Sequence, residues 1–369
     1  MSAQVSVLVP CYGDAHFVGR AVARILEGSK CDLEVVLVNN DDEQVAQVRA
    51  LVEALRDERI RVLELEHGAG FARAINAGIR ATTADLVFFA NSDLFVSDGY
   101  IDELVSFFER HPRASCAAGK ILRYDLDCDR ETDVIDTTGF IIGRNRRVAD
   151  RGENEEDTGR FERAEEVFGV SGAALVARRA ALEDVAVRGE FLDETFHMYK
   201  EDVDLCWRLR LAGWECWYVP SAVAHHGRTV HGLGRSSYVA NMRRFHANQK
   251  AKPLSTRMNS MQNHWLLLLK NEDLSNFLRD AVWILGREAI VLGYNVVLSP
   301  VDTMTTLSRL LRTIPEARVK RRAIKRRQLV SPAEVRRWFG GRRDRGPRRS
   351  LGAQSAVRDA ARGPDEELG

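Results

Sequence analysis

The sequence predicts an α/β fold in which a mainly parallel central sheet is flanked by helices and followed by a C-terminal helical extension. Three observations carry this prediction. Short β-branched runs alternate with segments of helical periodicity through the first part of the chain. The length of 369 residues exceeds the usual size of one domain. From about Arg243 to Arg327, residues that favour helices dominate.

Strands and helices are expected to follow one another closely in the first part of the chain. The predicted strands are the β-branched, apolar runs 5–9, 34–38, 60–65 and 86–90. The predicted helices have apolar residues at helical spacing and span 17–27, 43–55, 71–80 and 97–110. The last helix is closed by His111-Pro112, because the residue before a proline is disfavoured in helical conformation.

The middle of the chain is less regular. Residues 124–166 are rich in acids, glycines and arginines, so we expect a mobile loop there, with the role of a lid left open. Order is expected to return with a strand at 167–176, a helix from about Glu201 to Gly213 and a strand at 216–219.

Three parts are therefore expected. Residues 1–240 form the α/β domain, residues 241–330 the helical extension, and residues 331–369 a basic, disordered tail. The stretch 312–349 carries fifteen Lys or Arg against three acids. This local excess of positive charge needs its own explanation, because the formal net charge of the chain is only +1.

Composition excludes several classes of protein. The near-neutral charge points to no nucleic-acid partner. The six cysteines form no C-x-x-C pair, which argues against a zinc site and a secreted disulfide scaffold. The chain opens into an apolar run without the basic region of a signal peptide. The best apolar stretch, 283–298, is interrupted by Arg287 and Glu288. We therefore expect a cytoplasmic protein without a membrane span.

The polar residues that end predicted strands are the first candidates for a site, because ligands of open parallel sheets bind beyond those ends. Asn91-Ser92-Asp93 follows the fourth strand, and Asp93 offers a carboxylate to a hard divalent cation, which commonly holds a diphosphate. The other reading of this tripeptide is an N-cap for the helix that follows. The remaining strand ends are Pro10-Cys11-Tyr12, Asn39-Asn40-Asp41 and His67-Gly68-Ala69-Gly70.

Two further clusters carry ionisable groups. Glu201, Asp202 and Asp204 place three carboxylates within four residues, which repel one another unless a cation or a substrate hydroxyl uses them. One such carboxylate can act as a general base, whereas the alternative is a favourable interaction with the N-terminal dipole of a helix. The adjacent His225 and His226 follow a predicted strand, and an imidazole there can complete a metal shell with Asp93.

Six ordered segments within residues 4–235 resemble the motifs of glycosyltransferase family 2, whose members have the GT-A fold, and within it the rhamnosyltransferase-like branch. The segments are Val5 to Tyr12, Val35 to Asp41, Gly70 to Ile79, Phe88 to Asp93, Gly169 to Leu175, and Phe191 to Arg208.

The resemblance implies roles for individual residues. Pro10 and Tyr12 would line the nucleotide pocket, and Asp41 or Asn40 would meet the polar edge of the base. The floor beneath the nucleoside would be shaped by Gly70, Phe71 and Asn76.

Asn91-Ser92-Asp93 stands where the family has D-x-D, so the resemblance makes Asp93 the ligand of Mg²⁺ or Mn²⁺. The departure is Asn91, a neutral amide in place of the first carboxylate. His226, or else His225, would be the late metal ligand, and Asp202 would be the catalytic base. Glu201 and Asp204 would support that base or orient the acceptor.

The activity implied is metal-dependent, inverting transfer of a sugar from a nucleoside diphosphate, dTDP- or UDP-linked, with dTDP-rhamnose as the leading donor. The acceptor would be a hydroxyl of a glycan or of a polyprenyl-diphosphate-linked glycan in the synthesis of cell-surface polysaccharide. The Q-x-x-R-W motif of processive synthases does not occur in the chain, so one or a few sugars would be added. A sugar-nucleotide nucleotidyltransferase and a non-catalytic, glycan-binding scaffold subunit are the rival functions.

The helical extension combines apolar and aromatic residues between His264 and Leu311 with the basic stretch that follows. Such helices suit peripheral attachment to the anionic inner face of the cell membrane. Packing on the catalytic core or on a second subunit of a homo-oligomer is the alternative, and the sequence leaves both open.

Overall fold

The computed structural model describes residues 3–12, 15–227 and 253–340. Within these ranges, ten strands form one mixed sheet, in which eight follow the order β10-β12-β6-β11-β4-β1-β2-β3. Its parallel half contains the four strands expected from the β-branched runs: β1 (Val5–Cys11), β2 (Leu33–Asn39), β3 (Ile60–Glu64) and β4 (Leu86–Ala90). The carboxyl ends of these strands therefore meet at one edge of the sheet.

The other half of the sheet is antiparallel in part and extends beyond what the sequence predicts. Here β11 runs antiparallel to β4 and β6, whereas β12 runs parallel to β6. The short strands β10 and β5 pair with β12, and β7 pairs with β6. The bounds are β5 (Leu94–Val96), β6 (Ala114–Asp125), β7 (Arg130–Thr137), β10 (Glu165–Val167), β11 (Ala174–Arg178) and β12 (Glu215–His226).

Helices cover both faces of the sheet because successive residues of its strands point to opposite sides. Leu8 packs into the core beneath one set of helices, whereas Val7 and Val9 pack into the core on the other face. The first set is α3 (Phe71–Arg80), α5 (Arg179–Val185) and α6 (Glu201–Leu211). The second set is α1 (Ala15–Glu27), α2 (Val45–Leu55) and α4 (Tyr100–Arg110), and the 3-10 helices are η1 (Asp42–Gln44) and η2 (Glu194–Phe196).

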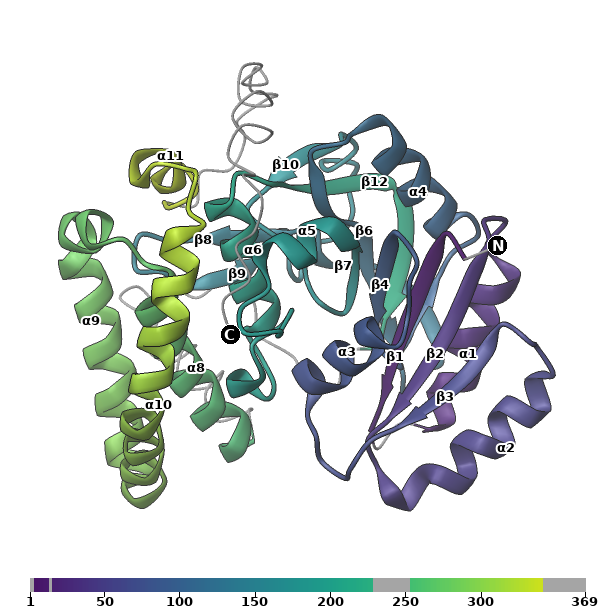
Figure 1. Ribbon diagram of the computed structural model, residues 1–369, viewed down its shortest axis with the longest axis horizontal. Helices are drawn as coiled ribbons and strands as arrows, with labels where there is room; N and C mark the ends of the chain where they lie inside the picture. The colour runs from purple at the N-terminus through teal and green to yellow at the C-terminus, as the bar shows by residue number, and fades with distance from the viewer. Residues whose placement is uncertain (1–2, 13–14, 228–252, 341–369) are drawn as a thin grey trace, which may run out of the picture.

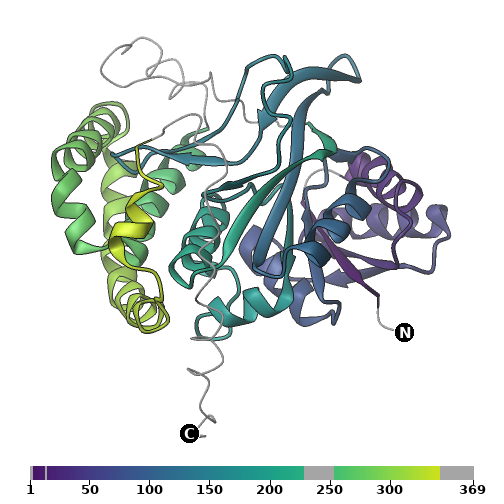
Figure 2. The ribbon, with the colours of Figure 1, turned by 90° about the horizontal axis from the view of Figure 1, so that it is seen from above.

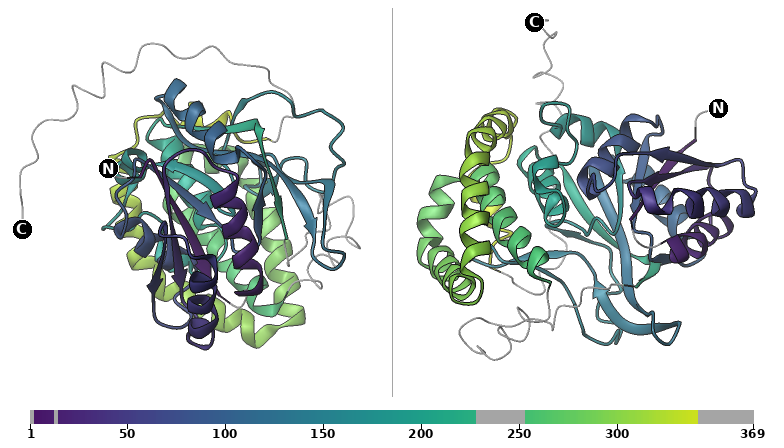
Figure 3. Two further views of the ribbon diagram at one scale, coloured as in Figure 1. Left: turned by 90° about the vertical axis from the view of Figure 1, so that its right-hand side faces the viewer. Right: turned by 90° about the horizontal axis from the view of Figure 1, so that it is seen from below.

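The helical extension packs against the first face, beyond α6 (Figure 1). It consists of α8 (Leu254–Asn271), α9 (Leu274–Leu298), α10 (Pro300–Arg326) and α11 (Pro332–Arg336). Seen from above, these helices lie at one end of the molecule and α1 and α2 at the other, with the sheet between them (Figure 2). The right-hand view of Figure 3, from below, shows the same order of layers. Leu266, Leu310 and Ile324 join the hydrophobic core around Trp207 of α6, so the extension shares a core with the sheet.

Buried ion pairs reinforce this junction. Lys270 of α8 pairs with Asp193 and, at 2.8 Å, with Asp204 of α6. Lys320 of α10 lies 2.7 Å from the same Asp193. The guanidinium of Arg208 donates to Asp204 at 2.8 Å and to the carbonyl oxygen of Val185 at 2.7 Å. Charges buried in this way are tolerated because each has an opposite partner.

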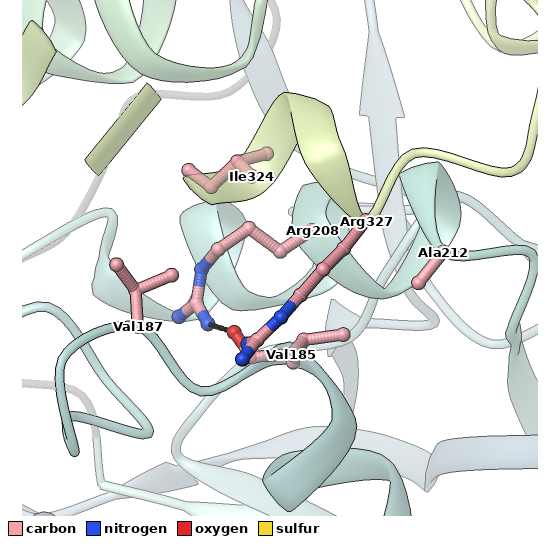
Figure 4. Close-up of a pocket in the computed structure, with 6 residues that line it drawn as sticks. All are labelled: Val185, Val187, Arg208, Ala212, Ile324 and Arg327. Carbon is pink, nitrogen blue, oxygen red and sulfur yellow. Dashed lines mark hydrogen bonds between the residues drawn. The ribbon is translucent and has the colours of Figure 1, made fainter. Parts of the chain in front are cut away.

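A small hollow beside Arg208 adjoins this junction (Figure 4). Its walls come from α6, α10 and the end of α5 rather than from the strand ends, and they consist of Val185, Val187, Arg208, Ala212, Ile324 and Arg327.

The expectation of a mobile loop over 124–166 is wrong for most of its length. Besides β7 and β10, the segment contains the paired strands β8 (Phe140–Ile142) and β9 (Val148–Asp150). Arg146 between them is fully buried and pairs with Glu272 and, at 2.9 Å, with Asp280. The acids and arginines that indicate exposure in the sequence thus compensate one another inside the fold.

The tail predicted as disordered from 331 also begins with ordered structure. Ser331 and Glu334 form a capping box that starts α11, and Trp338 and Phe339 pack against the core. Residues 341–369 of the predicted tail lie outside the described residues. The strand expected at 167–176 is likewise split between β10 and β11.

One helix of the described residues, α9, is long and apolar enough to cross a membrane by length and composition alone. Only 17% of its most apolar window is buried within the molecule. Arg287 and Glu288, which interrupt the apolar stretch, pair with each other, and Glu288 also accepts from Trp265 of α8.

Candidate functional site

The carboxyl ends of β1 and β2 form one end of the candidate site. Pro10 lies within β1 and Tyr12 directly follows the strand. The side chain of Tyr12 is 47% exposed. Its ring lies 5.7 Å from that of His67, whose Nδ1 is 3.5 Å from Oδ1 of the buried Asp41. The exposed aromatic ring can stack on a nucleoside base, and the buried carboxylate can bind the polar edge of that base. His67 belongs to the strand end 67–70 that the sequence singles out, but the sequence assigns no role to it.

Asn40 contributes an unsatisfied acceptor at the same place. Its main chain is held on both sides, because its N–H donates to the carbonyl oxygen of Cys11 and its carbonyl accepts from Gly68. Its side-chain Oδ1 is buried without a hydrogen-bond partner in the described structure. Leaving such an oxygen unpaired costs about 1–3 kcal/mol, and an N–H group of a ligand would remove that cost.

Gly70, Phe71 and Asn76 lie on the next segment, at α3. Gly70 has a φ of 84°, and a Cβ there would lie 2.5 Å from the imidazole of His197, so only glycine fits. Asn76 is fully buried and exchanges two hydrogen bonds with the main chain of Leu192. The side-chain amide of Asn76 therefore holds in place the segment that leads into α6.

Asn91, Ser92 and Asp93 form a turn rather than a helix cap. The turn leads directly into β5, and α4 begins only at Tyr100, after Gly99. Ser92 and Asp93 are buried. The helix-cap reading of the tripeptide is therefore wrong.

His226 joins Asp93 at this turn. Its Nε2 lies 3.2 Å from Asp93 Oδ1 and 3.2 Å from the amide nitrogen of Asn91. Its Nδ1 lies 3.0 Å from Oδ2 of Asp136, which is buried on β7. His226 of β12 pairs with Leu94 of β5, and this pairing brings His226 next to Asp93, the residue before Leu94. Asp136 is absent from the sequence prediction because β7 falls in the segment read as a loop.

Charge stabilises this row of side chains. Burial alone would lower the pKa of His226, but Asp93 and Asp136 raise it to about 10. Burial would raise the pKa of Asp93, and the charge and hydrogen bond of His226 instead lower it. Without a cation, the imidazole is thus a positive charge between two carboxylates.

The donor set fits a divalent cation. Two ligands bound at right angles, each about 2.1 Å from one ion, lie about 3 Å apart, close to the observed separation of Asp93 Oδ1 and His226 Nε2. Asp136, bonded to Nδ1, holds the ring so that Nε2 faces the site, as outer carboxylates do for metal-binding histidines. Asn91 adds a neutral side chain beside them.

His225 takes no part in this arrangement. Its Nδ1 lies 3.9 Å from Glu131, on the other side of β12, because neighbouring residues of a strand point to opposite faces. Burial lowers its pKa. Of the two histidines left open by the sequence, the geometry brings only His226 to Asp93.

Asp202 and the turn of Asn91 to Asp93 lie on either side of the short segment Gly172-Ala173. Its Oδ2 accepts from the N–H of Gly172 at 2.9 Å, and its Oδ1 from the N–H of Val203 at 2.7 Å. The next residue, Ala173, accepts from the N–H of Asn91 at 3.0 Å. A Cβ on Gly172 would lie 3.2 Å from Asp202 and 3.5 Å from Phe71, which explains the glycine. Burial raises the pKa of Asp202.

The two neighbouring carboxylates do not share this position. Glu201 is buried, its Oε2 has no hydrogen-bond partner in the described structure, and burial raises its pKa well above the usual range. Asp204 faces the helical extension, where Lys270 and Arg208 neutralise it. The hydrogen bonds to Asp202 come from the main chain of Gly172 and Val203 rather than from these two side chains, and their support of Asp202 stays a prediction.

Three thiols also gather in the core. Cys116, Cys206 and Cys216 are buried, with sulfur atoms within 4.8 Å of one another, although their spacing in the sequence shows no motif. Hydrogen bonds with Cys116 and Cys206, and then the charge of the adjoining Arg210, lower the pKa of the Cys216 thiol. A positive charge at this place opposes the entry of a cation.

Comparisons with known proteins show the family to which the chain is similar. Residues 6–186 match the model of glycosyl transferase family 2. The chain is 31% identical over 254 residues to N-acetylglucosaminyl-diphospho-decaprenol L-rhamnosyltransferase of Mycobacterium tuberculosis (strain ATCC 25618 / H37Rv), covering 64% of this chain and 79% of that protein. It is 33% identical over 226 residues to pre-mycofactocin glycosyltransferase of the same strain, covering 61% of this chain but only 43% of that protein.

The fold is similar to a solved structure as well. A crystal structure of GalNAc-T7 with UDP, GalNAc and Mn²⁺ superposes with a TM-score of 0.54 over 73% of this chain and 48% of that one, at 12% sequence identity. At that identity the likeness concerns the fold alone.

Proposed function

The chain belongs to glycosyltransferase family 2, and from that premise we propose that it transfers a sugar from a nucleoside diphosphate to a hydroxyl group of an acceptor. One observation carries the proposal. The turn with Asp93 and the carboxylate of Asp202 are held on either side of Gly172-Ala173 by main-chain hydrogen bonds. A diphosphate site and a general base are thereby joined through two residues.

The diphosphate end would be held through a divalent cation, Mg²⁺ or Mn²⁺, bound by Asp93 and His226. The cation supplies positive charge to the departing diphosphate. Asp136 keeps the imidazole in the orientation that presents Nε2. Asn91 contributes no negative charge, so we expect weaker binding of the metal than two carboxylates would give.

Asp202 is proposed as the base. Its carboxylate removes the proton of the acceptor hydroxyl as the oxygen bonds to the anomeric carbon, while the bond from that carbon to the diphosphate breaks on the opposite face. Such a single displacement inverts the configuration. Burial raises the pKa of Asp202, which makes it a stronger base than an exposed aspartate.

We propose that the nucleoside of the donor carries a pyrimidine base. Thymine and uracil carry a ring N–H that can donate to the unpaired Oδ1 of Asn40, while the ring can stack on Tyr12. The name of the 31% identical relative supports rhamnose as the sugar, and we propose dTDP-rhamnose as the donor, with UDP-linked sugars as the alternative.

The same relative supports a polyprenyl-diphosphate-linked glycan as the acceptor, in the synthesis of a cell-surface polysaccharide. We propose that the enzyme works at the inner face of the cell membrane and adds one or a few sugars.

A screen of nucleoside-diphosphate sugars tests the proposal. We expect Mn²⁺-dependent release of the nucleoside diphosphate from a dTDP- or UDP-linked sugar, together with a thermal shift of the protein. Release of pyrophosphate from a nucleoside triphosphate would instead favour a nucleotidyltransferase. Failure to bind any donor would favour a glycan-binding scaffold.

A further inference from the structure

The outer surface of α9 is unusually apolar. Exposed apolar side chains recur every three or four residues from Leu274 to Leu285, and a second group follows at Val296, Val297 and Leu298. The most exposed are Val282 at 84%, Val297 at 79%, Leu274 at 67% and Leu278 at 65%. Trp283 and Leu285 are also more than half exposed. Soluble monomers rarely leave so continuous a patch to water.

This outer surface continues around the turn into α10. Leu298, Val301 and Met304 are exposed on either side of Ser299, at the connection between the two helices. α9 forms the outermost layer of the molecule, farthest from α2 (Figures 1 and 2). The whole patch, defined as the outer face, consists of Leu274, Leu278, Val282, Trp283, Leu285, Val296, Val297, Leu298, Val301 and Met304.

The exposed charges of α9 and α10 are mainly positive. Arg279 is exposed on α9, and the exposed side of α10 carries Arg309, Arg312, Arg318, Arg322 and Arg326. Within these two fully described helices, Asp302 is the only exposed acid. Pairing the face with a second copy by two-fold symmetry would bring the same arginines together with little to offset them. An anionic surface complements them instead.

We infer that the outer face and the arginines of α10 bind the surface of an anionic lipid bilayer. Apolar side chains enter the boundary between headgroups and acyl chains, Trp283 lies at that boundary, and the arginines lie near the lipid phosphates and attract them. The buried face of α9 stays on the protein, because Asp280 is bound there by Arg146 and Arg336.

The bilayer would then lie close to the acceptor side of the proposed site, and this step rests on the proposed function. Ser299 at the turn accepts from Arg257 of α8 at 2.8 Å, and the adjacent Thr256 lies 3.5 Å from the hydroxyl of Tyr199. Tyr199 precedes Asp202 by three residues. The same contacts that hold the turn thus reach the segment that positions the base, where a lipid-linked hydroxyl must arrive.

Vesicle flotation of the full chain tests the inference. We expect the protein to float with vesicles of phosphatidylglycerol and phosphatidylcholine, to stay behind with pure phosphatidylcholine, and to be released by salt. Leu278→Glu/Val282→Glu should weaken binding by about tenfold or more. The matched control is Ala46→Glu/Ala50→Glu, which adds the same charges with the same spacing on the exposed side of α2 and should bind as the unchanged protein does.

Two measurements keep the outcomes apart. A full chain that ignores anionic vesicles, or a Leu278→Glu/Val282→Glu variant that binds them normally, overturns the inference. So does a dimer that this variant splits into monomers without any binding to vesicles. Donor hydrolysis in the absence of vesicles should be equal in both variants. Flotation without hydrolysis would sink the proposed function and leave the membrane surface standing.

Discussion

The imidazole of His226 joins two carboxylates that the sequence separates widely: its Nδ1 lies 3.0 Å from Asp136, while its Nε2 faces Asp93 at 3.2 Å. The outer carboxylate therefore decides which ring nitrogen is offered to a cation.

Asp136→Asn should therefore weaken metal binding without removing a ligand. Loss of the charged partner at Nδ1 is expected to reduce the affinity for Mn²⁺ by about 10–100-fold. Titration of the metal-free protein with Mn²⁺, followed by calorimetry, measures this. Asp133→Asn changes an exposed residue of the same strand and should have no effect. Equal Mn²⁺ affinities of the Asp136→Asn and Asp133→Asn variants would show that Asp136 does not orient the imidazole of His226 for the metal.

Asp202→Asn should abolish transfer and spare the donor. An amide keeps the shape but cannot take a proton, so we expect kcat to fall by about 10²–10⁴-fold, with donor affinity changed little. Steady-state kinetics and a thermal shift with the nucleoside diphosphate measure the two effects. Transfer retained at near the original rate would refute the assignment of the base.

Glu201→Gln is the contrasting change at the neighbouring carboxylate. Burial, followed by the charge of Asp202, raises the pKa of Glu201 and so favours its neutral form, which a neutral amide resembles. We expect kcat and the thermal midpoint of unfolding to stay close to those of the unchanged enzyme. A loss as large as that of Asp202→Asn would make Glu201 the base instead.

Lys270→Met should destabilise the protein strongly. The change leaves Asp193 and Asp204 buried with one positive partner fewer, which costs about 3–5 kcal/mol of unfolding free energy. Urea denaturation measures it, with Lys30→Met, an exposed lysine, as the control. Adding Asp204→Asn should restore part of the loss, because it removes one of the stranded charges. A loss no larger than that of the control would show that the pairs contribute little.

His264 predicts a dependence of stability on pH. Burial lowers its pKa to about 3, while the unfolded chain takes up a proton at its ordinary value near 6.5. The unfolded state therefore binds more protons below pH 6.5, and the free energy of unfolding should fall as pH drops from 6.5 toward 3. Between pH 6.5 and 5, one such group accounts for about 2 kcal/mol. In His264→Gln this fall should be shallower, whatever the starting stability; parallel pH profiles would contradict the prediction.

The parallel half of the fold could be predicted because the local residue pattern of each of its strands is typical of a strand. β1, β2 and β4 are apolar runs buried on both faces, β3 is a β-branched run at the edge of the sheet, and α3 follows the expected bounds. β6 escaped prediction although it lies within the sheet. Its run of small residues around Ala117 and Gly119 lacks the β-branched pattern, and Gly119 is required because a Cβ there would collide with the carbonyl of Ala222.

The candidate site divides in the same way. Asp93, His226 and Asp202 stand at element ends, where a polar residue after an apolar run is visible in the sequence. Asp136 and His67 could not be chosen, since their importance depends on pairing between distant strands and on a turn. Asp204 was assigned to the wrong surroundings, because spacing along a helix does not tell which side the extension covers.

The ion pairs of Lys270 and Lys320 have a consequence for the order in which the chain matures. Asp193 and Asp204 leave the ribosome long before the lysines that neutralise them, and the hydrophobic surface around Trp207 waits for Leu310 and Ile324. During synthesis the catalytic helix is thus an unfinished structure, open to chaperones. We therefore expect the surroundings of Asp204 to be complete only after α8 and α10 have been synthesised.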